Sequence, residues 1–71
     1  MMRNNTQIFI TKIPLTWNAS NLVDIFQRYG QIRDVTVKRG FGFVEFNEGK
    51  EAVKAVKGMK TEDNIDGLHV E

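Results

Sequence analysis

The sequence predicts an α+β domain with the element order β-α-β-β-α-β. In four segments apolar and polar residues alternate as they do in half-buried strands. In two segments between them, apolar residues recur at helical spacing. The chain has 71 residues, of which 41% are hydrophobic, so it is long and apolar enough for one domain with one core.

The first half of the chain predicts a strand followed by a helix. Residues 1–7 are largely polar and are expected to form a flexible arm before a single domain at residues 8–71. Residues 8–13 are rich in β-branched side chains and predict a strand, which Pro14 ends because it lacks an N–H group. Asn18 is the expected N-cap of the first helix, and Gly30 is expected to end it in a left-handed conformation. The apolar stripe of this helix is Leu22, Ile25, Phe26 and Tyr29.

The second half predicts a hairpin, a helix and a last strand. Residues 32–38 and 41–46 alternate in polarity, and Arg39-Gly40 between them predicts a hairpin with a very short loop. A second helix is expected to start at residues 47–49, with small alanines that allow close packing on a sheet. Its apolar positions are Ala52, Ala55, Val56 and Met59. A polar connection at residues 60–67 leads to a short strand at residues 68–71.

This order corresponds to the ferredoxin-like arrangement, a four-stranded antiparallel sheet with both helices on one face. Each β-α-β crossover is expected to be right-handed. In this topology the first and third strands are the central neighbours. The side chains expected under the helices are Ile8, Ile10, Val35, Val37, Val44, Phe46, Leu68 and Val70. Those expected on the open face are Phe9, Thr11, Thr36, Lys38, Phe41, Phe43, Glu45, His69 and Glu71.

Residues 39–46, Arg-Gly-Phe-Gly-Phe-Val-Glu-Phe, are the most informative stretch. Alternation places Phe41 and Phe43 on one face, where the topology adds Phe9 from the neighbouring strand. Exposed rings next to a cation provide a surface on which nucleic-acid bases stack. The alternative is that Phe41 and Phe43 are core residues and that Val44 and Phe46 point outward.

The stretch matches the RNP1 signature of the RNA-recognition motif. Residues 8–13 resemble RNP2, the second signature of that family, with Phe9 in the place of its stacking aromatic residue. Residues 29–46, with the short 38–40 connection, resemble the N-terminal RNA-recognition motif of serine/arginine-rich (SR) splicing factors. The resemblance implies single-stranded RNA binding in pre-mRNA splicing or other mRNA processing, in the nucleus, with or without shuttling to the cytoplasm. The chain departs from SR proteins in having one serine, so these 71 residues include no arginine–serine tail; either this is an excised domain or the SR subfamily does not apply.

Further residues on the open face are candidates for RNA contact. Arg39, at the basic first position of RNP1, is expected to contact a phosphate or stack on a base. Lys12 and Lys38 border the rings and either contact phosphates or are simply solvated. Glu45 either accepts hydrogen bonds from base amino groups or is tolerated there. The short polar side chains of Thr11 and Thr36 on this face are expected to read base edges. His69 is considered for a weak stacking or hydrogen-bonding role.

Several functional classes are disfavoured by composition. The net charge is only +1, so stacking rather than bulk charge is expected to dominate binding. With no cysteine and one histidine, neither a metal site, a cofactor nor an enzymatic activity is expected. No apolar run is long enough to span a membrane.

The rival hypothesis to RNA binding is a protein-binding version of the same fold. A protein partner on the helical face is compatible with both hypotheses. As an isolated domain the chain is expected to be monomeric.

Overall fold

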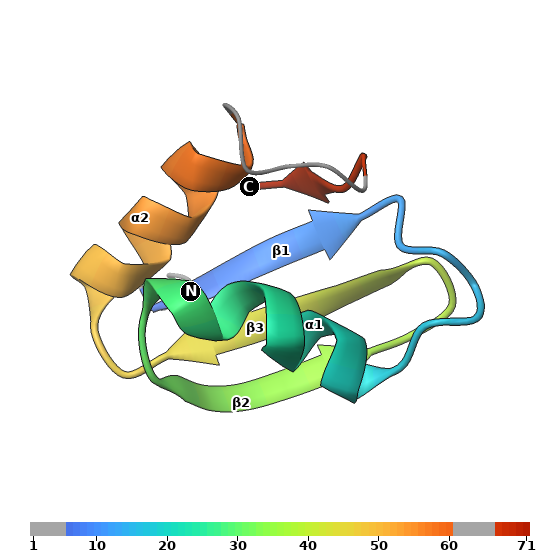
Figure 1. The fold of residues 1–71 in the computed structure, drawn as a ribbon, viewed down its shortest axis with the longest axis horizontal. Coiled ribbons are helices and arrows are strands. Elements are labelled where there is room, and N and C mark those ends of the chain that lie inside the picture. Colours follow the sequence, from blue (N-terminus) through green and yellow to red (C-terminus); the bar gives the residue numbers. More distant parts are fainter. Residues whose placement is uncertain (1–5, 61–66) are drawn as a thin grey trace, which may run out of the picture.

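The computed structural model describes residues 6–60 and 67–71, and their elements follow the predicted order (Figure 1). The predicted arm, apart from residues 6 and 7, and most of the 60–67 connection lie outside the described residues. The strands are β1 (Gln7–Thr11), β2 (Ile32–Val37), β3 (Phe41–Phe46) and β4 (His69–Val70). The helices are α1 (Ala19–Phe26), the short 3-10 helix η1 (Gln27–Tyr29) and α2 (Gly49–Met59).

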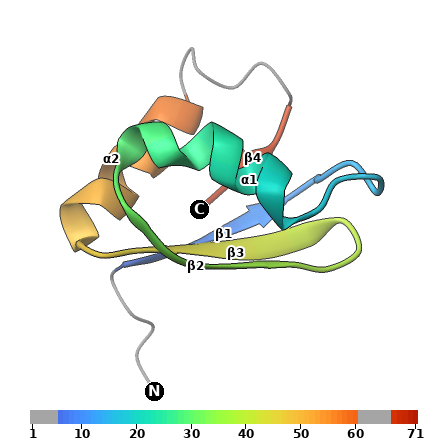
Figure 2. The ribbon, with the colours of Figure 1, turned by 60° about the horizontal axis from the view of Figure 1, so that its bottom comes forward.

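The four strands form one antiparallel sheet in the order β2-β3-β1-β4, which confirms the predicted topology. β1 and β3 are the central pair, joined over the whole length of β1. Figure 2 shows α1 and α2 on one side of the sheet, and none of the described residues on the other side form a covering element. The open face of the sheet is therefore accessible along both central strands.

The core lies between the sheet and the helices, as the alternation predicted. The inward side chains of β1 and β3 are buried, whereas those of the edge strand β2, Val35 and Val37, are only partly buried and pack against the core. Each large apolar side chain that is fully buried contributes about 1.5–3 kcal/mol. The buried residues are Ile8, Ile10, Ile13, Leu22, Phe26, Val44, Phe46, Ala52, Ala55, Met59, Leu68 and Val70.

The start of α1 agrees with the sequence, but its end does not. Asn18 is the N-cap, and its side-chain oxygen accepts a hydrogen bond from the Ser20 N–H at 3.0 Å. The predicted left-handed end at Gly30 is wrong, because this residue has φ of 162°, which is extended backbone. The reason for glycine is space: a Cβ here would lie 2.3 Å from the Glu51 side chain.

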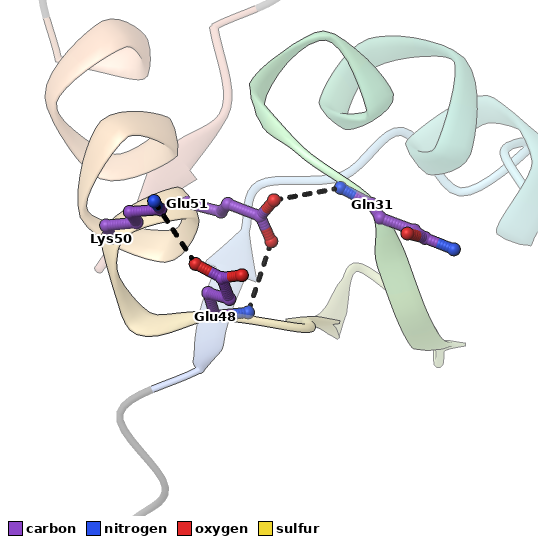
Figure 3. Close-up of polar contacts among 4 residues, drawn as sticks. All are labelled: Gln31, Glu48, Lys50 and Glu51. Atoms are coloured by element: carbon purple, nitrogen blue, oxygen red, sulfur yellow. Dashed lines mark hydrogen bonds and ion pairs between the residues drawn. The ribbon is translucent and has the colours of Figure 1, made fainter.

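Glu51 links the start of α2 to the start of β2 (Figure 3). One carboxylate oxygen accepts a hydrogen bond from the Glu48 N–H at 3.1 Å, and the other accepts one from the Gln31 N–H at 3.4 Å. Lys50 forms an exposed ion pair with Glu48 at 3.4 Å. Glu51 thus occupies two backbone donors that belong to elements far apart in the chain, and Gly30 leaves room for it.

We expect Glu51→Ala to lower the free energy of unfolding by about 1 kcal/mol, the usual loss when a capping side chain is removed. Urea denaturation would measure the change. Lys50→Ala is the matched control on the same helical turn, and it should have little effect because exposed ion pairs contribute little. Equal stability of the Glu51 variant and the wild type would contradict this role.

Candidate nucleic-acid interface

The strand register arranges the open face into three rows that cross the sheet. The middle row is Thr36, Phe43, Phe9 and Glu71. The basic row is Lys38, Phe41, Thr11 and His69. The acidic row is Asp34, Glu45 and Gln7. Eight of the ten predicted site residues therefore lie in these rows. The other two follow directly at the strand ends, Lys12 after Thr11 and Arg39 in the turn after Lys38.

The three predicted rings form one cluster on the central strands. The ring centroids of Phe9 and Phe43 are 5.1 Å apart, and those of Phe9 and Phe41 are 6.0 Å apart. Phe41 is 38% exposed, while the other two rings are half-buried. Val44 and Phe46 are completely buried, so the alternative that Phe41 and Phe43 form the core is wrong.

The glycines of this stretch allow the two strands of the hairpin to approach closely. A Cβ on Gly42 would lie 2.3 Å from the Thr36 carbonyl oxygen on β2. Gly40 has φ of 86°, a conformation that other residues rarely adopt. The Lys38 N–H then donates to the Phe41 carbonyl at 2.7 Å and closes the turn. Gly40 therefore allows the tight turn, and Gly42 allows β3 to lie close to β2. Together they fix the position of the strand that carries Phe41 and Phe43.

The charges on this face are separated along the strands. Lys12, Lys38 and Arg39 are exposed and lie beyond or within the basic row. Asp34 and Glu45 lie at the other end, in the acidic row. The Glu45 carboxylate accepts a hydrogen bond from the Thr6 hydroxyl at 3.0 Å, a contact that the sequence did not predict. Exposed cations therefore gather at one end of the rings and carboxylates at the other, where the exposed Arg33 stands next to Asp34.

The side chain of His69 lies next to that of Glu71, a residue expected on this face but not among the predicted site residues. Its Nε2 lies 2.8 Å from a Glu71 carboxylate oxygen, and both side chains are more than half exposed. The spacing of two along a strand was the available signal, because it places both side chains on one face. Glu71 pairs with Phe9 through two backbone hydrogen bonds of 2.9 Å, so it brings a negative charge to the edge of the rings.

Within residues 6–60 and 67–71, no group of three or more acidic or histidine side chains is placed to hold a metal ion. No helix in the same part of the chain is long and apolar enough to cross a membrane. The arrangement combines flat apolar rings, short hydroxyl side chains and cations at one margin, which suits unpaired bases joined by phosphates.

Comparisons with known proteins agree with this geometry. The family model described as RNA recognition motif matches residues 8–70. The SR-type shuttling mRNA binding protein NPL3 of Saccharomyces cerevisiae is 39% identical over 54 residues, which are 76% of this chain and 13% of that protein. Human serine/arginine-rich splicing factor 5 is 40% identical over 50 residues, which are 70% of this chain and 18% of that protein. The chain thus spans less than a fifth of these curated relatives.

Solved structures show the same architecture. The Nab3 RRM, from a study of the recognition of cis elements in non-polyadenylated RNAs, has a TM-score of 0.83 and 28% identity, and the match covers 96% of this chain and 93% of that one. A Sxl-lethal protein/RNA complex has a TM-score of 0.82 and 28% identity, covering 94% of this chain and 47% of that one. The domain resembles the RNA recognition motifs of SR proteins, and the chain belongs to the RNA recognition motif family.

Proposed function

We propose that this domain binds single-stranded RNA across the open face of its sheet, with bases stacking on Phe9, Phe41 and Phe43. The observation that carries this proposal is the cluster of three rings, 5.1 and 6.0 Å apart, on the two central strands. Each stacked base contributes about 1–3 kcal/mol. Two or three unpaired bases are the number that such a surface can hold.

The margin of the ring cluster supplies the remaining contacts. Lys12, Lys38 and Arg39 hold phosphates at the basic end, and affinity accordingly falls as salt rises. Thr11, Thr36, Glu45 and His69 contribute hydrogen bonds to base edges in this proposal. With a net charge of only +1, stacking carries more of the affinity than charge. We expect a micromolar dissociation constant for the isolated domain, about −8 kcal/mol.

The biological setting that we propose is mRNA processing in the nucleus. It is supported by the similarity to a shuttling mRNA binding protein and to a splicing factor. Pre-mRNA splicing is the finer proposal, and shuttling to the cytoplasm is compatible with it. The domain acts by binding as a monomer and carries out no catalysis of its own.

Contact with a protein partner on the helical side is a second candidate function. Val53 on α2 is 52% exposed. It lines a groove of about 290 Å³ with residues of β1, α2 and the chain end. The α2 residues of the groove lie on the side of the sheet opposite the rings (Figure 2), whereas Gln7 and Glu71 connect the groove to the edge of the open face. The residues lining the groove are Gln7, Ile8, Ala52, Val53, Val56, Lys57 and Glu71.

Titration with short single-stranded RNA of random sequence, followed by amide chemical shifts, tests the main proposal. The expected result is a set of shift changes on β1 and β3 that saturates with RNA concentration. Shift changes confined to α1 and α2, or none at all, would reject RNA binding through the open face. The same spectra recorded with a protein partner would show changes around Val53 if the second function holds.

The phosphate role of Arg39 predicts a change in salt dependence. We expect Arg39→Gln to weaken RNA binding several-fold and to reduce the slope of log affinity against log salt by about one, because one phosphate contact is lost. Titrations over a series of salt concentrations measure this slope. Lys54→Gln makes the same charge change on an exposed position of α2 and should leave the slope unchanged. Identical slopes for Arg39→Gln and the wild type would exclude a phosphate contact.

A further inference from the structure

The groove beside α2 is apolar inside and lies next to a series of lysines, and this combination indicates one kind of occupant. We propose that it holds a short acidic segment of a partner protein, which inserts a large apolar side chain into the groove and places carboxylates on the lysines. The proposal gives the chemistry of the partner in the second candidate function, and it rests on that function.

The inside of the groove is aliphatic. Ile8 of β1 and Ala52 of α2 line it and are buried, and Val56 is partly buried against the core beside them. Val53 lines the same groove but is more than half exposed. A large apolar side chain placed in the groove, which has a volume of about 290 Å³, would remove this exposed surface from water.

Exposed lysines follow α2 next to Val53 and form what we call the lysine stripe. Residues three and four positions apart are neighbours on a helix surface, so Lys50 and Lys57 flank Val53. Lys57 also lines the groove itself. The apolar opening and the cations are therefore parts of one surface. The residues of the lysine stripe are Lys50, Lys54, Lys57 and Lys60.

The carboxylates near this surface have other partners within the domain. Glu51 accepts hydrogen bonds from two backbone N–H groups, and Glu48 pairs with Lys50 at 3.4 Å (Figure 3). Glu71 lines the groove, but its carboxylate lies 2.8 Å from Nε2 of the β4 histidine. In the part of the chain that the structure describes, no carboxylate pairs with Lys54, in the middle of the lysine stripe. Carboxylates of a partner would therefore complement the charge of this surface.

An acidic peptide fits this surface better than a second stretch of RNA does. The residues that line the groove include no aromatic ring on which a base could stack, whereas the open face carries three. An aliphatic groove favours burial of an apolar side chain, and the lysines favour acidic residues on either side of it.

Selection from a library of short displayed peptides of random sequence tests the proposal. The wild-type domain is the target, and counter-selection with Val53→Asp removes peptides that bind elsewhere. Because Val53 is more than half exposed, this variant should remain folded, and its amide spectrum checks that it does. The enriched peptides should carry a large apolar residue and an excess of carboxylates, and they should shift the amide resonances around Val53.

An enriched peptide is then synthesised and titrated against single variants. Lys54→Gln should weaken its binding about 1.5- to 5-fold at low salt, the range for one exposed ion pair. Arg33→Gln makes the same charge change on β2, at the opposite edge of the sheet from β4, and should leave binding unchanged. Leu15→Ala removes an exposed apolar side chain in the loop after β1 and is the second control.

The outcomes separate the chemistry of the partner from the existence of the docking site. Peptides that bind the groove without an excess of carboxylates, or that bind Lys54→Gln as tightly as the wild type, overturn the acidic partner but leave the second candidate function intact. If no peptide is enriched, or if the shift changes avoid Val53, both fail. A short RNA that shifts the resonances around Val53 would assign the lysine stripe to RNA and would also overturn the proposal.

Discussion

Phe43→Ala is expected to weaken RNA binding by about 5- to 150-fold while the domain remains folded. This range corresponds to the 1–3 kcal/mol of binding free energy that is lost when the aromatic side chain under a stacked base is replaced by alanine. Phe43 lies between Thr36 and Phe9 in the middle row, and its ring is 5.1 Å from that of Phe9. Its loss therefore removes one stacking surface and the support of a second. Titration with the same short RNAs measures the change.

The control for this prediction is Phe43→Tyr, which keeps the flat ring and should retain affinity close to that of the wild type. Urea denaturation of each variant separates lost binding from lost folding. A Phe43→Ala protein that is folded and binds RNA as tightly as the wild type would contradict the stacking proposal. Phe41→Ala is a second test of the stacking proposal, because the Phe41 ring is the most exposed of the three, and this variant too should bind RNA more weakly.

Gly42→Ala is expected to lower the free energy of unfolding by about 3 kcal/mol, at the upper end of the usual cost of overpacking. A Cβ at this position would lie 2.3 Å from the Thr36 carbonyl oxygen and 3.2 Å from the Val37 Cα. Both are backbone atoms of β2, so the hairpin itself must open to make room. The loss would be measured by urea or thermal denaturation, and at this chain length it corresponds to a fall in melting temperature of more than about 10 °C.

Gly40→Ala separates steric overlap from backbone strain. Gly40 has φ of 86°, but a Cβ on it would meet nothing closer than Leu15 at 3.8 Å. Its replacement should therefore cost only about 1 kcal/mol, from the left-handed conformation alone. A Gly42→Ala variant no less stable than Gly40→Ala would show that β2 and β3 do not require glycine for their close approach.

The local pattern of the chain was sufficient for the element order and for the face on which each strand residue lies. The period of two in residues 8–11 and 41–46 placed Phe9, Phe41 and Phe43 opposite the core, and the structure confirms this. Asn18 was recognisable as an N-cap because this role depends on residues only two or three positions away. These features are local in sequence, and local physics determines them.

Other features depend on residues that meet only after folding. Gly30 was expected to adopt a left-handed conformation, but it is extended and instead leaves space for Glu51, twenty-one positions later in the sequence. Leu15 carried no signal, because its exposure results from the turn at Lys12 and from the hydrogen bond between Ile13 and Gly40. The separation of acidic and basic rows likewise follows from the register between strands. Sequence periodicity determined which side chains face outward in this protein, whereas the pairing of distant strands and loops decided which of them are neighbours.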